Sequence, residues 1–121
     1  MMADLQGQRV KRWAISPSAR EIVLETEMFD DDFVRGSSLE RFKIVFSGVR
    51  AYQLNGEMEC SLRELRELTV NELARIEDSR LESLLQWAVG ESGEQKVFRV
   101  ESDAAMDDFI ACRDCSIDRL G

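Results

Sequence analysis

The sequence predicts a single α+β domain over residues 1–121, with an antiparallel sheet built from N- and C-terminal segments and one or two helices packed against it. Three observations favour this class: apolar and polar residues alternate in residues 20–29 and 41–54, residues 79–90 have a helical apolar period, and two short alternating segments follow. A chain of 121 residues can bury a core without a disulfide or a structural metal.

The first two predicted strands come from the N-terminal half. Residues 20–29 place Ile22, Leu24, Thr26 and Met28 on one face, which is typical of a half-buried strand. Turn-forming residues at 30–38 separate it from a second strand over residues 41–54. Gly48 interrupts the alternation of this second strand and indicates a bulge or bend. Asn55-Gly56 is a pair that tolerates positive φ and ends the strand.

A helix is predicted over residues 79–90. Its first residues, Ser79-Arg80-Leu81-Glu82, match a capping box, and Gly90 can close its C-terminus. The side chains at helical spacing are Leu81, Leu84, Leu85, Ala88 and Val89.

The segment before this helix is less regular. Ser61-Leu62-Arg63-Glu64 is a second capping-box sequence, which predicts a short helix near residues 61–69. Residues 72–77 fit either a helix or a strand.

Two more strands are predicted at residues 95–101 and 108–117, around a polar turn at residues 102–107. The last strand contains Cys112 and Cys115. Residues three apart in a strand point to opposite faces, so we expect these two cysteines neither to share a metal nor to pair. A zinc site needs about four ligands, whereas the chain has no histidine and only Cys60 besides. We interpret both cysteines as small buried apolar residues.

The charge is acidic and unevenly distributed. Sixteen Lys and Arg against twenty-four Asp and Glu give a net charge of −8, and all of the excess lies after Gly56. Such a surface repels nucleic acid and anionic membranes and attracts basic proteins. The N-terminus lacks a signal-peptide pattern, and no apolar run approaches the roughly 20 residues of a membrane span. We therefore expect a cytoplasmic protein with no nucleic-acid or membrane partner.

The absence of histidine limits the possible chemistry. It removes Ser-His-Asp and Cys-His nucleophiles, which leaves carboxylates as the candidate reactive groups. The acidic clusters do not have the spacing of a calcium loop, and we interpret them as solvated loop acids. We expect no catalytic residue, no cofactor and no metal; a divalent-metal carboxylate enzyme is the less favoured alternative.

Binding to another protein is the expected role. Trp87 lies off the apolar stripe of its helix, and Trp13 lies in a segment with no clear assignment, so each is a candidate partner contact. The acidic candidates for the same role are Asp103, Asp107 and Asp108. The main alternative is a self-associating accessory or housekeeping domain, because an open sheet edge can pair in a homodimer.

Three stretches carry a resemblance to a protein class: FKIVFSGVRAYQLNGE, IEDSRLESLLQW and KVFRVESDAAMDDFIACRDCSI, within residues 42–117. Their order resembles small acidic bacterial proteins of the immunity type, which are encoded beside polymorphic or contact-dependent toxins. The resemblance implies a non-enzymatic protein that neutralises a basic toxin by direct binding. It favours a strand over residues 72–77 and assigns no site residues.

Overall fold

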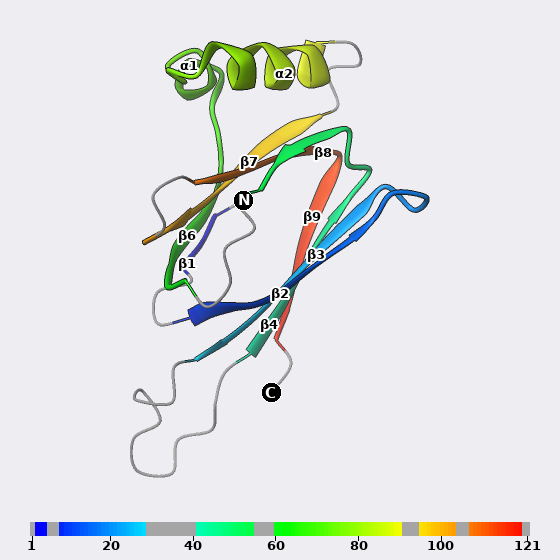
Figure 1. Cartoon of the computed structure of the whole chain (residues 1–121), viewed down its shortest axis with the longest axis vertical. Helices are drawn as coiled ribbons and strands as arrows, with labels where there is room; N and C mark the ends of the chain where they lie inside the picture. The colour runs from blue at the N-terminus through cyan, green and yellow to red at the C-terminus, as the bar shows by residue number, and fades with distance from the viewer. Residues whose placement is uncertain are drawn as a thin grey trace.

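The computed structural model describes residues 2–4, 8–28, 41–54, 60–90, 95–103 and 107–119, which form two antiparallel sheets and two helices. The five-stranded sheet has the order β1 (Met2–Asp4), β6 (Leu62–Glu67), β7 (Lys96–Ser102), β8 (Asp108–Cys112) and β5 (Ala51–Gln53). The four-stranded sheet has the order β2 (Gln8–Ser16), β3 (Glu21–Met28), β4 (Arg41–Ser47) and β9 (Asp114–Arg119). Helices α1 (Val70–Leu73) and α2 (Ser79–Gly90) lie together at one end of the molecule (Figure 1). The α+β class is therefore confirmed, with two sheets in place of one.

Two bent segments carry the chain from one sheet to the other. β4 continues into β5 through residues 48–50, and β8 continues into β9 through Arg113. Figure 1 shows β8 and β9 meeting at a sharp corner. At this corner the Arg113 N–H donates to the Ser47 carbonyl at 3.0 Å, and the Arg50 N–H donates to the Ala111 carbonyl at 2.9 Å. The predicted bend at Gly48 is thus confirmed, and it joins the sheets.

The two sheets enclose the main core, because each contributes its inner face. The four-stranded sheet supplies alternating side chains of β3 and β4, and the five-stranded sheet supplies those of β6, β7 and β8. The rings of Phe46 and Phe98 meet edge to face across the core, with centroids 6.0 Å apart. At the opposite side from the corner, an isolated bridge between Arg9 and Ser61 links β2 to β6.

The helices cover part of the outer face of the five-stranded sheet. Leu81, Leu85 and Ala88 of α2 are buried against Val97 and Ala111 of β7 and β8. This confirms the predicted helix. Its N-cap is Asp78, one residue earlier than expected, since the Asp78 carboxylate accepts from the N–H groups of Arg80 and Leu81 at 3.0 and 3.2 Å.

The predicted helix over residues 61–69 is wrong, because Leu62–Glu67 form strand β6. Leu62 and Leu65 are both buried although they are three residues apart. The register against β7 shifts between Leu62 and Glu64, and this bulge turns two side chains at helical spacing to the same face. The backbone N–H and C=O groups of β6 then pair with those of β7 in the sheet.

Two further segments, residues 72–77 and 8–16, differ from the sequence prediction or were left unassigned by it. The strand favoured for residues 72–77 is wrong: α1 covers Val70–Leu73 and a turn follows at residues 74–75. Residues 8–16, which had no clear assignment, form β2. The predicted turn at residues 30–38 and the end at Asn55-Gly56 lie outside the described residues.

The corner at Gly48 gives a test of the fold. Gly48 has φ +66°, and a Cβ built there would lie 2.8 Å from the Cβ of Arg113. We expect Gly48→Ala to lower the free energy of unfolding by about 1–3 kcal/mol, because both the backbone conformation and the close approach oppose a side chain. Urea unfolding measures this difference.

Gly90→Ala is the matched control. Gly90 is the last residue of α2, and nothing lies within 4 Å of a Cβ built there. We expect it to leave the stability unchanged or to raise it by up to about 1 kcal/mol. Equal effects of the two substitutions would contradict the importance of the corner.

Candidate functional site

Two arginines lie side by side on the outer face of the five-stranded sheet, where the helices no longer cover it. Arg66 of β6 and Arg99 of β7 are directly paired in the register, as are Glu64 and Glu101. Leu65 and Val100, between them, point the other way into the main core. Alternation along both strands thus sets two like charges next to each other, an arrangement that needs compensating anions.

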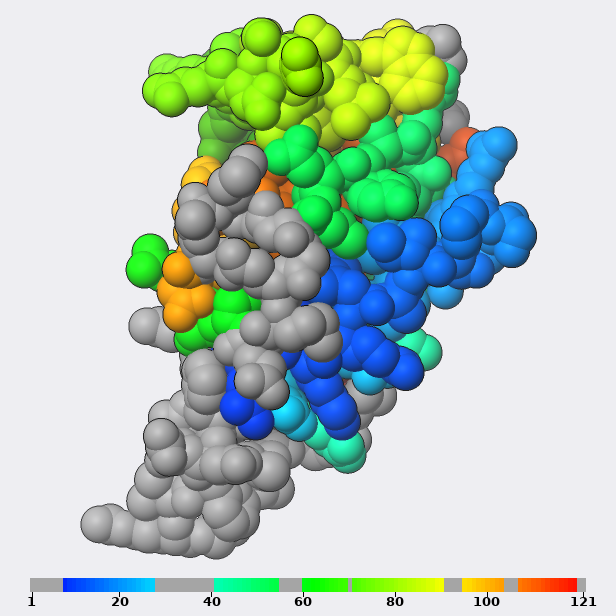
Figure 2. Space-filling view, in the orientation of Figure 1, coloured from blue at the N-terminus to red at the C-terminus, as the bar shows by residue number. Residues whose placement is uncertain are grey.

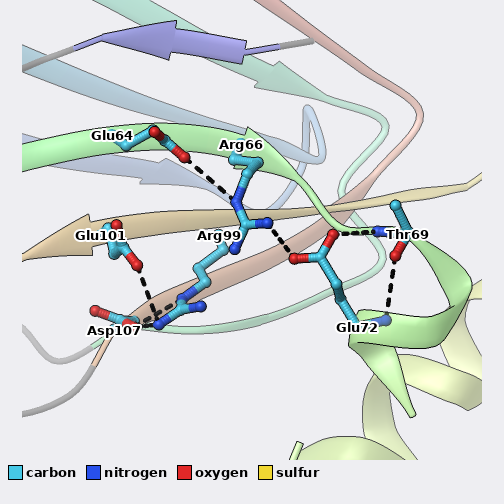
Figure 3. Close-up of polar contacts among 7 residues, drawn as sticks. All are labelled: Glu64, Arg66, Thr69, Glu72, Arg99, Glu101 and Asp107. Carbon is cyan, nitrogen blue, oxygen red and sulfur yellow. Dashed lines mark hydrogen bonds and ion pairs between the residues drawn. The ribbon is translucent and has the colours of Figure 1, made fainter. Parts of the chain in front are cut away.

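Four carboxylates surround the two guanidinium groups (Figure 3). Glu64 lies 3.3 Å from Arg66, and Glu101 lies 3.3 Å from Arg99. Asp107, just before β8, accepts from Nε of Arg99 at 2.7 Å and also from Nη2. Glu72 of α1 accepts from Arg66. We call these six residues the charge network; it joins β6, β7, the start of β8 and α1.

A capping box fixes Glu72 in this position. The Thr69 N–H donates to Oε1 of Glu72, and the Glu72 N–H donates to Oγ1 of Thr69, both at 3.2 Å. These hydrogen bonds, with the Thr69 backbone contribution largest, and the nearby Arg66 lower the pKa of Glu72 below its usual 4.5. The helix α1 begins at this box and holds an ionised carboxylate over the sheet.

A cavity of about 470 Å³ opens beside the charge network, between the helices and the sheet. Its apolar lining consists of Leu68, Ile76, Leu81 and Phe109. Its charged lining consists of Glu72, Arg75, Glu77, Asp78, Arg99 and Asp107. Together the network and the cavity contain six carboxylates and three guanidinium groups, an excess of three negative charges. We call this cavity the acidic pocket.

The three predicted acidic contacts are not one cluster. Asp107 belongs to the acidic pocket. Asp103 is exposed, and its carboxylate accepts from the Ser61 N–H at 2.9 Å. Asp108 is buried, with 6% of its surface exposed, so it is not placed for contact with a partner.

The two tryptophans also differ. Trp13 is half-buried and packs against the main core. Trp87 is exposed over 51% of its surface, and the guanidinium carbon of Arg50 lies 4.5 Å from its ring centroid. Trp87 therefore keeps the surface position that a contact residue needs.

Cys112 and Cys115 are both buried in the main core. The expectation that their side chains point to opposite faces is therefore wrong. Cys112 and Cys115 are free thiols with 0% and 8% of their surface exposed. The corner at Arg113 shifts the alternation by one residue, so both side chains point inward. Burial raises the pKa of each thiol to about 12. Both are protonated at neutral pH and are poor nucleophiles.

Among the described residues, no group of three or more His, Cys, Asp or Glu side chains could hold a metal ion. The arrangement instead presents fixed carboxylates to an incoming cation. Sequence reasoning missed Arg66, Arg99 and Glu72. The Thr69-x-x-Glu72 pattern could have indicated α1, but the pairing of Arg66 with Arg99 depends on the register between strands.

Comparison with protein-family models, curated proteins and solved structures finds no match to this chain. No helix in the described part of the chain has the length and apolar character to cross a membrane.

Glu72 gives a pH-dependent prediction. Because its folded-state pKa is lowered, its contribution to stability is present above pH 4.5 and is lost as pH falls through the folded-state value. We expect Glu72→Gln to be less stable than the wild type near neutral pH and to approach it as the pH falls below 4.5. Urea unfolding at several pH values measures the difference; a constant difference at all pH values would contradict the ionic role of Glu72.

The thiols give a second prediction. Cys60 is only half-buried, so we expect it to react first with Ellman's reagent at about pH 8, and the other two only after unfolding. Cys60→Ser should remove the fast phase of labelling. Rapid labelling of all three thiols in the native protein would contradict this account.

The two buried thiols should also make the free energy of unfolding fall as pH rises from 9.0 towards about 12, because the thiols of the unfolded chain ionise first in this range.

Proposed function

We propose that this chain is a non-catalytic protein-binding domain whose partner is a basic protein, and that it acts as an immunity protein neutralising a basic toxin by direct binding. The observation that carries the proposal is the acidic pocket: a cavity with an apolar floor and an anionic rim, next to a preorganised charge network.

The pocket suits a lysine or arginine side chain. Its volume of about 470 Å³ lies towards the small end of ligand pockets. Lysine and arginine have an apolar stem and a charged head, so the stem can pack on Ile76, Leu81 and Phe109 while the head reaches the carboxylates of the rim. An anionic ligand would instead meet the excess of negative charge.

The charge network supports this role by holding its carboxylates in place before the partner arrives. Arg66 and Arg99 each bind two carboxylates, which limits the repulsion among the acids and the side-chain entropy lost on binding. The net charge of −8 adds long-range attraction for a basic protein and speeds association at low ionic strength.

A charge reversal tests the proposal. Glu77 is exposed on the rim of the pocket. The proposal predicts a basic toxin encoded by a neighbouring gene. Against that protein, we expect Glu77→Arg to weaken the complex about tenfold or more, because it places a cation where the partner's basic side chain binds. Titration calorimetry measures the affinity, and growth of cells producing the toxin measures protection.

Asp118→Arg is the matched control. Asp118 is exposed on β9, in the other sheet, and the substitution changes the net charge by the same amount. We expect its affinity to stay within about twofold of the wild type at physiological salt, where charges further apart than a Debye length are screened. Equal losses for both variants, or no complex and no protection by the wild-type protein, would overturn the proposal.

A further inference from the structure

The exposed large hydrophobic side chains of the described residues gather beside the middle of α2, whereas the acidic pocket lies at its start. They are Ile15, Tyr52, Leu84 and Trp87, with 44%, 43%, 38% and 51% of their surface exposed. They come from the end of β2, from β5 and from α2, which form a continuous surface in Figure 2. Grouped exposure of this kind marks an interaction site more often than scattered single residues do.

Three of these side chains line a groove of about 310 Å³, which we call the α2–β5 groove: Ile15, Tyr52 and Leu84, with Arg20 and Arg50 at its rim. Arg20 and Arg50 also line the neighbouring hollow, which contains Trp87. The hollow therefore adjoins the groove. The walls are tied together, because the Val49 N–H donates to the Arg20 carbonyl at 2.8 Å.

The charge around the groove is opposite in sign to that of the whole chain. Arg20, Arg50 and Arg113 line the groove and the hollow, and Glu21 is the single carboxylate among the lining residues that the structure describes. A ligand in the groove therefore meets a local excess of positive charge, whose effect is strongest within a Debye length of about 8 Å. An apolar segment carrying carboxylates is the complementary ligand.

Strand edges border the same groove. β5 ends the five-stranded sheet and β2 ends the four-stranded sheet. An edge strand offers peptide N–H and C=O groups to another extended chain. In the neighbouring hollow, Oε1 of Gln95 is buried and has no hydrogen-bond donor in the described part of the chain. A ligand with backbone N–H groups would supply a donor of the kind this oxygen lacks.

We propose that the α2–β5 groove binds an extended acidic and apolar segment of a partner protein, with Tyr52, Leu84 and Trp87 as anchors and Arg20 and Arg50 as charge contacts. A second copy of the chain is a poorer occupant, because a two-fold axis through the groove would bring the same arginines together. The inference does not rest on the acidic pocket, because the groove and the pocket share no lining residue among those described.

Peptide selection tests the proposal on the whole chain. A phage library of random linear peptides, about 12 residues long to match a strand and its flanks, is selected on the immobilised protein. We expect the enriched peptides to alternate Asp or Glu with apolar residues and to shift the emission of exposed Trp87 to shorter wavelength on binding. An enriched peptide, labelled with fluorescein, is then titrated against variants by anisotropy.

Leu84→Ser and Arg50→Glu should each weaken peptide binding about tenfold or more, as expected for anchor and charge contacts. Arg80→Glu is the matched control: Arg80 is exposed on the same helix but does not line the groove. It should change binding less than about twofold. Glu77→Arg should also leave this binding unchanged, which separates the groove from the proposed function.

Three results would overturn the proposal. They are enrichment of basic peptides, absence of any enriched peptide, and equal effects of Arg50→Glu and Arg80→Glu. Sedimentation equilibrium tests the other possible occupant, a second copy of the chain. A dimer of the wild-type chain that Leu84→Ser dissociates would assign the groove to self-association and would also overturn the proposal. A monomer at all concentrations used for binding supports it.

Discussion

The close approach of two backbones at Gly48 and Arg113 determines how the rest of the molecule is arranged. Here β4 and β8 each leave one sheet and enter the other, held by hydrogen bonds between Ser47 and Arg113 and between Arg50 and Ala111. A side chain at residue 48 would collide with Arg113, and φ there is positive. Both strands turn at the same point, so the two sheets face each other and share one core. At the corner itself, the sheets are joined by the chain.

The corner also decides which surfaces remain available. It places β5 and β8 beneath α2, so the outer face of the five-stranded sheet is apolar under the helix and charged beyond it. The charge network occupies the charged part, and α1 reaches it through the Thr69–Glu72 capping box. Beside the middle of α2, the start of β5 meets the turn after β2 and forms the α2–β5 groove. The start of α2 therefore borders the acidic pocket, and its middle borders a groove with arginines in its lining.

The parts of this fold that follow a single local rule could be predicted from sequence. Alternation identified β3 and β4, a 3.6-residue period identified α2, and Gly48 marked the bend. The errors occurred where two strands adjust to each other: the bulge in β6 imitates helical spacing, and the corner after Cys112 shifts the alternation. Neither the bulge nor the corner can be recognised from the residues of one strand alone. The candidate site was missed for the same reason, because Arg66 and Arg99 meet only through the register of β6 against β7.

The same register explains why the charged site suits binding better than acid–base chemistry. Two adjacent arginines on neighbouring strands repel each other, and the carboxylates around them offset this repulsion. The pKa of Glu72 is lowered first by its hydrogen bonds to Thr69 and also by Arg66. A carboxylate that exchanges a proton near neutral pH would need the opposite environment, one that is apolar or crowded with other acids. Glu72, held by Thr69 and Arg66, has the environment of a carboxylate that stays ionised, which fits the proposed contact with a cation.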